Sequence, residues 1–139
     1  MRCLGIDYGE RRVGLAFGDE LGVAVPLPAA VEAELKVRLQ HIVQLAGERR
    51  ITDLVVGYPY NMDGSIGFKA REVDAFIERL VRLLALPVHR VDERLSSRAA
   101  SGHLPKRRDD ELRRSGRIDS MAASLILQDF FNQKFPPTP

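Results

Sequence analysis

The feature that most constrains the fold is a single aspartate, Asp7, within an apolar stretch near the N-terminus. Residues 3–18 predict an apolar strand, a tight turn and a second apolar strand, with Asp7 inside the first. An acid in a buried strand is costly unless it is paired, protonated or bound to a cation. The alternative is a plain hairpin in which Asp7 only caps the turn. Four glycines leave room for another backbone or a phosphate group to approach this hairpin; they are Gly5, Gly9, Gly14 and Gly18.

Composition predicts one globular domain. The 139 residues are 45% hydrophobic and 29% charged, which suits a chain with a hydrophobic core rather than a disordered one. No apolar run reaches the roughly 18 residues needed to span a bilayer. The N-terminus lacks the pattern of an export signal, and the one cysteine, Cys3, cannot form an internal disulfide. We therefore expect a single domain over 1–134, a frayed tail over 135–139 and a cytoplasmic location.

The order of the predicted elements indicates a mixed α/β sheet. A third strand over 22–27 ends at Pro26 and Pro28, and such prolines suit an edge strand. The later elements are predicted from apolar spacing: helix 31–50, strand 53–57, helix 68–84, strand 87–91, a short helix from Ser96, a mobile loop over 102–115 and a helix over 116–132. A three-strand antiparallel meander followed by two parallel strands gives a five-stranded mixed sheet with helices on both faces. This order of elements resembles the α/β architecture of ribonuclease H-like domains.

Three acid-bearing segments are expected at one edge of this sheet. The first strand is central, so Asp7 should lie near the carboxyl ends of the parallel strands, beside the Asp92–Glu93 turn. A helix packed across that edge can bring Asp119 to the same place. Convergent carboxylates repel one another unless cations neutralise them, and oxygen-only ligands are typical of Mg²⁺ or Mn²⁺. Two such ions can activate water and stabilise the leaving oxygen in phosphodiester hydrolysis.

Each acid also has a purely structural interpretation. Asp119 could favour a helix dipole, and Asp92 and Glu93 could cap the helix that follows them. Asp63 precedes Gly64 and is interpreted as a turn former. The three histidines are scattered, and no Cys/His pair has the spacing of zinc ligands.

Positive charge is concentrated in one region. The net charge is only +2, but residues 106–117 carry six positive side chains. Such a cluster predicts a phosphate-binding patch, and the alternative is a solvated loop. The residues predicted to bind nucleic acid are Arg11, Arg12, Asn61, Lys106, Arg107, Arg108, Arg114 and Arg117.

Four segments resemble the signature segments of the YqgF (RuvX) family. They are Ile6-Asp7-Tyr8-Gly9, Val56-Gly57-Tyr58-Pro59-Tyr60-Asn61-Met62-Asp63-Gly64, Asp92-Glu93-Arg94-Leu95-Ser96-Ser97 and Gly116-Arg117-Ile118-Asp119-Ser120. They occur in the family's order and span almost the whole chain. Family members are bacterial proteins of this size, described as pre-16S rRNA nucleases and earlier as Holliday junction resolvases. The resemblance implies a ribonuclease H-like fold, divalent-metal nuclease activity and trimming of the 5′ end of the 16S rRNA precursor.

The resemblance also implies which residues act. Carried over by position, the catalytic and metal-binding acids are Asp7, Glu93 and Asp119. Junction resolvases of this superfamily use four acids, and Asp92 is the nearest candidate for a fourth. The family pattern usually has leucine where this chain has Tyr58 and Tyr60. These rings either stack on an unpaired base or pack on the next helix.

The residues leave more than one functional class open. A metal-dependent endonuclease is the first, and only the resemblance favours rRNA over a DNA junction as its substrate. A non-catalytic nucleic-acid-binding module would not need acids at all three positions. An actin-like kinase or ATPase uses a similar Asp-x-Gly hairpin but needs a second domain. A resolvase would be a homodimer because its substrate has two-fold symmetry, whereas rRNA trimming suits a monomer.

Overall fold

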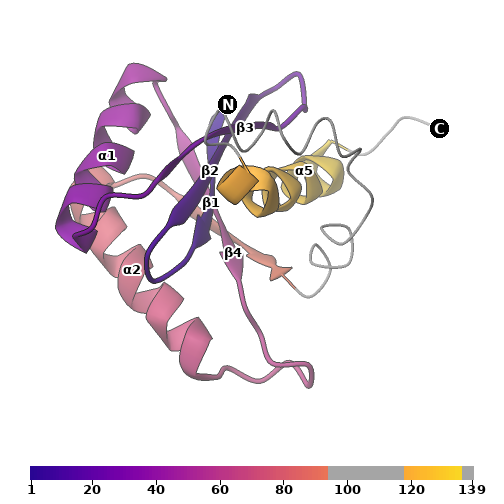
Figure 1. Cartoon of the computed structure of the whole chain (residues 1–139). Helices are drawn as coiled ribbons and strands as arrows, with labels where there is room; N and C mark the ends of the chain where they lie inside the picture. Colours follow the sequence, from indigo (N-terminus) through magenta and orange to yellow (C-terminus); the bar gives the residue numbers. More distant parts are fainter. Residues whose placement is uncertain (94–117, 136–139) are drawn as a thin grey trace.

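Five strands form one mixed sheet with β1 at its centre (Figure 1). The computed structural model describes residues 1–93 and 118–135. Its elements are β1 (Arg2–Tyr8), β2 (Val13–Asp19), β3 (Val25–Ala30), α1 (Leu35–Glu48), β4 (Asp53–Tyr58), α2 (Phe68–Leu84), β5 (Val88–Asp92), the 3₁₀ turn η1 (Ile118–Ser120) and α5 (Met121–Lys134). The strand order is β3-β2-β1-β4-β5, antiparallel on the β2 side of β1 and parallel on the β4 side. The predicted meander and two parallel strands are confirmed.

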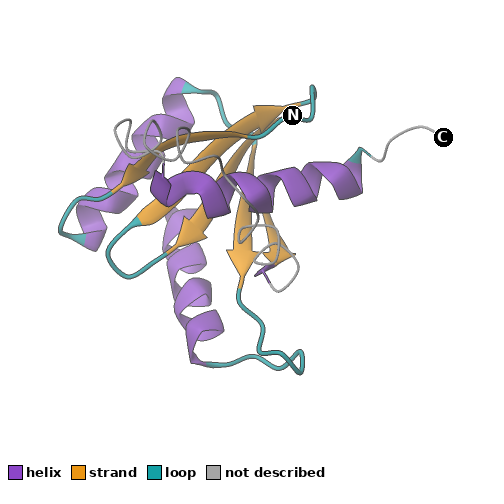
Figure 2. Ribbon diagram, turned by 45° about the vertical axis from the view of Figure 1, so that its right-hand side comes forward, coloured by secondary structure: helices purple, strands orange, loops and turns teal. Residues whose placement is uncertain are grey.

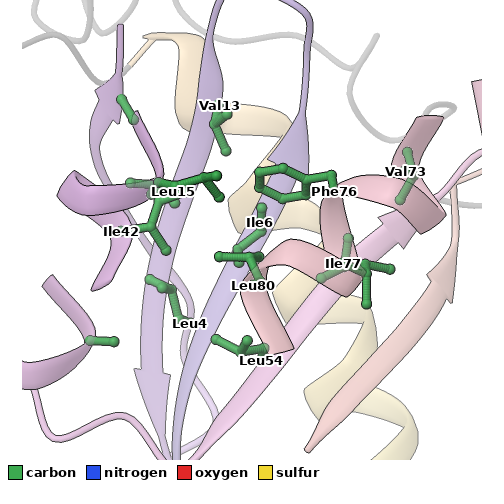
Figure 3. Packing of buried hydrophobic residues seen from close by; sticks show 14 of the residues in the cluster. Leu4, Ile6, Val13, Leu15, Ile42, Leu54, Val73, Phe76, Ile77 and Leu80 are labelled. Atoms are coloured by element: carbon green, nitrogen blue, oxygen red, sulfur yellow. The ribbon is translucent and has the colours of Figure 1, made fainter. Parts of the chain in front are cut away.

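Helices cover both faces of the sheet, as predicted. Figure 2 shows α5 crossing one face, with α1 and α2 behind the strands on the other. Side chains of a strand alternate between its faces, so Leu4 and Ile6 face α1 and α2 and pack with Phe76 and Leu80 (Figure 3). Cys3 belongs to the smaller core beneath α5. Asp7 shares the parity of Cys3 and therefore lies on the α5 face.

Two glycines allow α5 and η1 to lie directly on the strands. A β-carbon at Gly5 would lie 2.8 Å from Leu127 Cβ, on α5. A β-carbon at Gly14 would collide with the backbone carbonyl of Asp119. The predicted close approach of another backbone is therefore found, and the approaching backbone is that of the C-terminal helical segment.

Two boundaries differ from the sequence-based predictions. The third strand was expected over 22–27, but β3 runs from Val25 to Ala30 and contains both prolines. It is an edge strand, so a missing N–H on its open side costs no ladder hydrogen bond. The first long helix was expected from about residue 31 but begins at Leu35, because the chain before it still belongs to β3 and the following loop.

Several predicted features lie outside the described residues. These are the short helix from Ser96, the loop over 102–115, and all but the first residue of the tail over 135–139. Phe135 stacks on Phe131, with ring centroids 6.0 Å apart. None of the helices in the described ranges is long and apolar enough to cross a membrane.

Candidate active site

Asp7 and Glu93 meet at the carboxyl edge of the parallel strands. Asp7 is the penultimate residue of β1, and Glu93 directly follows β5. Because β1, β4 and β5 are parallel, their carboxyl ends share one edge of the sheet. The side chains of Asp7 and Glu93 share a hydrogen bond. Two carboxyl groups can form such a bond only when one of them holds a proton.

Gly57 makes this meeting possible. It lies on β4, between the strands that carry the two acids, and its place in the ladder is opposite Val91. A β-carbon at Gly57 would lie 2.6 Å from Glu93 Oε1 and 2.5 Å from Ile126 Cδ1. The missing side chain therefore provides the space that the Glu93 carboxyl group occupies. This role of Gly57 was not predicted from the sequence, although a glycine at the end of an otherwise apolar strand was a signal for it.

Burial raises the pKa of both carboxyl groups and so disfavours their ionised forms. Burial raises the pKa of Asp7, and the hydrogen bond from Glu93 partly opposes that rise. The pKa of Glu93 rises to about 7, first because of burial and second because of the nearby Asp7 charge; Lys69 acts in the opposite direction. Near neutral pH the pair therefore favours one shared proton. A bound cation would, like the shared proton, reduce the repulsion between the two carboxylates.

The two acids line a cavity of about 440 Å³, which we call the acid pocket. Its lining residues are Asp7, Tyr8, Gly9, Glu10, Pro59, Lys69, Glu72 and Glu93. Four of them carry carboxyl groups and one carries an ammonium group, so the donor set suits a hard cation such as Mg²⁺ or Mn²⁺. Within residues 1–93 and 118–135, no three acid, histidine or cysteine side chains are grouped closely enough to hold one ion.

Glu72 and Lys69 are pocket residues that the sequence analysis missed. They lie three positions apart in the first turns of α2, so they share one side of that helix. The signal was their position, because α2 begins directly after the loop at the carboxyl edge. Asp92, the predicted spare acid, is not among the lining residues, since successive strand residues point to opposite faces.

Asp119 lies at the same edge but is engaged differently. The Arg12 guanidinium donates to both of its carboxylate oxygens at 3.1 Å. Its backbone carbonyl lies against Gly14, the residue that pairs with Asp7 across the hairpin. The next residue, Ser120, fixes the turn because its buried Oγ accepts the Leu15 N–H at 3.0 Å. The backbone of Asp119 is thus held beside the acid pair while its side chain binds Arg12.

A second cavity lies on the Asp119 side of the hairpin turn. It has a volume of about 640 Å³, and we call it the arginine pocket. Its lining residues are Arg11, Arg12, Val31, Ala33, Arg38 and Asp119. Arg11 and Arg12, both predicted to bind nucleic acid, are exposed at the turn. The other predicted basic residues, Lys106, Arg107, Arg108, Arg114 and Arg117, lie outside the described residues.

The loop between β4 and α2 extends beyond the carboxyl edge (Figure 1). Asn61, predicted to bind nucleic acid, lies in it, and its side-chain amide donates to Ser65 Oγ at 3.0 Å. Asp63 Oδ1 accepts the Ser65 N–H at 2.9 Å, as expected of a turn former. Asn61 therefore helps to shape the loop, and its contact with nucleic acid stays a prediction.

For Tyr58 the structure distinguishes between the two interpretations. Only 3% of Tyr58 is exposed, and its hydroxyl donates to Asp74 on α2 at 2.7 Å. The ring therefore packs on the next helix and is not accessible for base stacking. Tyr60 packs edge-on against Tyr58, with ring centroids 4.8 Å apart.

Comparison with known proteins agrees with this geometry. The family described as "RuvX: Holliday junction resolvase" matches residues 1–133. A relative from Opitutus terrae, named "Putative pre-16S rRNA nuclease", is 57% identical over 138 residues, covering 99% of this chain and 95% of its own length. A relative of the same name from Trichormus variabilis is 42% identical over 131 residues, covering 94% and 87%.

Solved structures show the same fold at low sequence identity. The Thermus thermophilus RuvC structure is 17% identical with a TM-score of 0.53, covering 96% of both chains. The Fowlpox virus Holliday junction resolvase is 10% identical with a TM-score of 0.56, covering 96% of this chain and 99% of that one. The ribonuclease H-like architecture predicted from the order of elements is thereby confirmed. The chain belongs to the RuvX (YqgF) family of nucleases.

Proposed function

We propose that this chain is a divalent-metal-dependent nuclease that processes the 5′ end of the 16S rRNA precursor. The observation that carries the metal dependence is the buried Asp7–Glu93 pair, whose carboxyl groups share a proton in a pocket lined by four acids. An uncompensated carboxylate pair is costly to bury, so its natural complement is a cation. The family and the names of the relatives support hydrolysis of nucleic acid.

The proposed roles follow from the positions of the acids. Asp7 and Glu93 would hold Mg²⁺ or Mn²⁺ through oxygen ligands. The bound ions would activate water and stabilise the leaving oxygen of the phosphodiester. Asp119 would add the third carboxylate if its side chain left Arg12 for the acid pocket; in support of this, its backbone contacts Gly14, the residue that pairs with Asp7.

Two features of the proposal come from the relatives rather than from the site. Pre-16S rRNA is the substrate in the names of the curated relatives, and a substrate of this kind supports a cytoplasmic location as part of the proposal. A Holliday junction is the second candidate substrate, favoured by the description of the matching family. Both substrates are phosphodiesters, so the acid pocket would serve either.

The test is cleavage of a labelled 16S precursor leader and of a four-way DNA junction, each with Mg²⁺ or Mn²⁺. Asp7→Asn keeps the size of the side chain and removes its charge, and we expect it to abolish metal-dependent cutting. Glu78→Gln, on the exposed side of α2, is the matched control and should cut normally. Cutting of the junction alone would move the function to recombination. Binding of RNA without any metal-dependent cutting would contradict the proposal.

A further inference from the structure

The arginine pocket contains a buried positive charge that the fold alone does not explain. Arg38 is only 4% exposed, although it lies on a helix whose neighbouring polar residues face solvent. It forms no ion pair with any carboxylate in the described parts of the chain. Burying a guanidinium without a counter-charge is costly, so the position of Arg38 calls for an explanation.

The hydrogen bonds of Arg38 hold it in place without neutralising it. Its Nη1 donates to the carbonyls of Glu32, at 2.5 Å, and Ala33, at 3.1 Å. Its Nη2 donates to the carbonyl of Glu10, at 2.8 Å, in the hairpin turn. Its Nε is buried and has no hydrogen-bond partner among residues 1–93 and 118–135. Three carbonyls therefore fix the orientation of the group, while no carboxylate of the described residues pairs with its charge.

Three arginines thus line one cavity with a single acid, Asp119, among the lining residues. Arg38 is fixed by backbone carbonyls, Arg12 is paired with Asp119, and Arg11 is exposed. Convergent guanidinium groups match the oxygens of a phosphate because each group presents several N–H donors in one plane. The pocket is therefore complementary to an oxyanion.

The hairpin turn relates this pocket to the acid pocket. Gly9 and Glu10 line the acid pocket, whereas Arg11 and Arg12 line the arginine pocket. The Glu10 carbonyl is bound by Arg38, so the same turn joins the two sites. A nucleic-acid strand that lies across the turn would present one phosphate to each side of it.

We propose that the arginine pocket of Arg11, Arg12 and Arg38 binds a backbone phosphate of the nucleic-acid strand, next to the phosphate that is cut. This inference rests on the proposed function for the identity of the strand. The role of Arg38 follows from its buried, uncompensated charge and not from its position in the sequence.

The first test is binding of a short single-stranded RNA without divalent metal, so that cutting does not contribute. Arg11→Gln removes a pocket charge without removing a side-chain hydrogen bond within the part of the chain that the structure describes, and should weaken binding about fivefold to tenfold. It should also reduce the salt dependence of binding by about 0.7 in the log–log slope. Arg50→Gln, an exposed site just after α1, is the matched control and should bind within about twofold of the wild type. Equal effects of Arg11→Gln and Arg50→Gln would overturn the proposal.

The second test observes Arg38 in the wild-type protein, because Arg38→Gln removes bonds that hold the fold together. In side-chain NMR spectra, inorganic phosphate should shift the Arg38 Nε–H signal, and the same ionic strength of chloride should not. The RNA should displace the phosphate. A signal that neither phosphate nor RNA moves would overturn the site, and phosphate that the RNA cannot displace would overturn its assignment to the strand. RNA that binds through this pocket but is never cut would leave the inference standing and contradict the proposed function instead.

Discussion

The acid pocket and the arginine pocket lie on opposite sides of one hairpin turn and bury opposite charges in different ways. In the acid pocket, Asp7 and Glu93 face each other and share a proton, so the charge of the pair depends on what is bound. In the arginine pocket, backbone carbonyls hold Arg38, and its charge does not change.

This difference separates two tasks. A site that exchanges a proton for a cation can be switched between states, which suits chemistry that needs metal ions. A site whose charged group is held in position by carbonyl oxygens suits recognition, because it is already arranged before the phosphate arrives. The comparison predicts that changes on one side of the turn alter cutting and that changes on the other alter binding.

The largest expected effect is the loss of cutting in Asp7→Asn. If Asp7 holds the metal as proposed, its substitution should lower kcat by about a thousandfold or more, since it removes stabilisation of the reacting phosphate. RNA affinity measured without metal should stay within about threefold of the wild type. Arg11→Gln should show the opposite pattern, with a raised KM and an almost unchanged kcat. Steady-state kinetics on one leader RNA would measure both variants. If they changed kcat alike, the two pockets would not have separate roles in cutting and binding.

The next effect is steric and concerns Gly57. Gly57→Ala would place a methyl group within 2.6 Å of Glu93 Oε1 and 2.5 Å of Ile126 Cδ1, so either α5 or Glu93 must move. We expect a loss of about 1–3 kcal/mol in the free energy of unfolding, together with weaker metal binding. Urea denaturation and Mn²⁺ titration would measure the two effects.

Gly47→Ala is the control for that substitution. Apart from its chain neighbours and the nearby backbone of its own helix, no described atom lies within 4 Å of the position where its β-carbon would be, and Gly47 is in α1, where alanine is the better helix former. It should leave metal binding unchanged and raise stability by up to about 1 kcal/mol. Equal destabilisation by the two substitutions would show that Gly57 has no special relation to Glu93.

The acid pocket was more predictable from the sequence than the arginine pocket. Asp7 was conspicuous because an acid inside an apolar strand is rare. Its position at the carboxyl edge of the sheet followed from the order of the elements. The same rule for parallel strands indicated the Asp92–Glu93 turn, and the family resemblance singled out Glu93 within it. These are local patterns combined with a topology that has few alternatives, and the structure brings these two acids together.

Arg38 could not be predicted in this way. It is a charged residue in an amphipathic helix, and the pattern alone assigns it to the solvent face. Its burial depends on the carbonyl of Glu10, 28 residues earlier in the chain. The start of α1 was equally hard to predict, since its N-cap residue, Glu34, makes no side-chain capping bond. Tertiary contacts decide both features, and neither leaves a periodic signal.

A smaller effect concerns the pH dependence of stability without metal. The pKa of Glu93 is raised to about 7 in the folded protein, above its ordinary value. The folded state therefore holds its proton more tightly than the unfolded state, and stability falls as pH rises from about 4.5 to about 7. Because Glu93 is partly solvated, we expect Glu93→Gln to remove only about 1 kcal/mol of this fall.

Thermal unfolding at pH 5 and pH 8 in the presence of a chelator measures that change. Glu93→Gln should narrow the difference in Tm between the two pH values by roughly 3–5 °C. Glu78→Gln, at an exposed position on α2, should leave the difference as it is. If both variants narrowed it equally, the proton would not belong to the buried pair.

The smallest effect tests the ion pair between Arg12 and Asp119, which both line the arginine pocket. Arg12 donates to both carboxylate oxygens of Asp119 at 3.1 Å, and 64% of the Arg12 side chain is exposed. An exposed pair of this kind contributes at most about 1 kcal/mol, so its loss should change another equilibrium by no more than about fivefold. If Asp119 is the third ligand, Arg12→Gln should tighten Mn²⁺ binding by about twofold to fivefold without nucleic acid.

Arg11→Gln makes this test specific. It removes the same charge from the same turn but leaves the bond between Arg12 and Asp119 intact. General electrostatics would therefore tighten Mn²⁺ binding in both variants, whereas release of Asp119 would tighten it further in Arg12→Gln alone. Calorimetric titration of both variants decides between these outcomes. A larger effect in Arg12→Gln would mean that a phosphate competing for Arg12 also frees an acid for the metal, so that binding on one side of the turn prepares cutting on the other. Equal effects would separate the two pockets and leave Asp119 as a partner of Arg12 only.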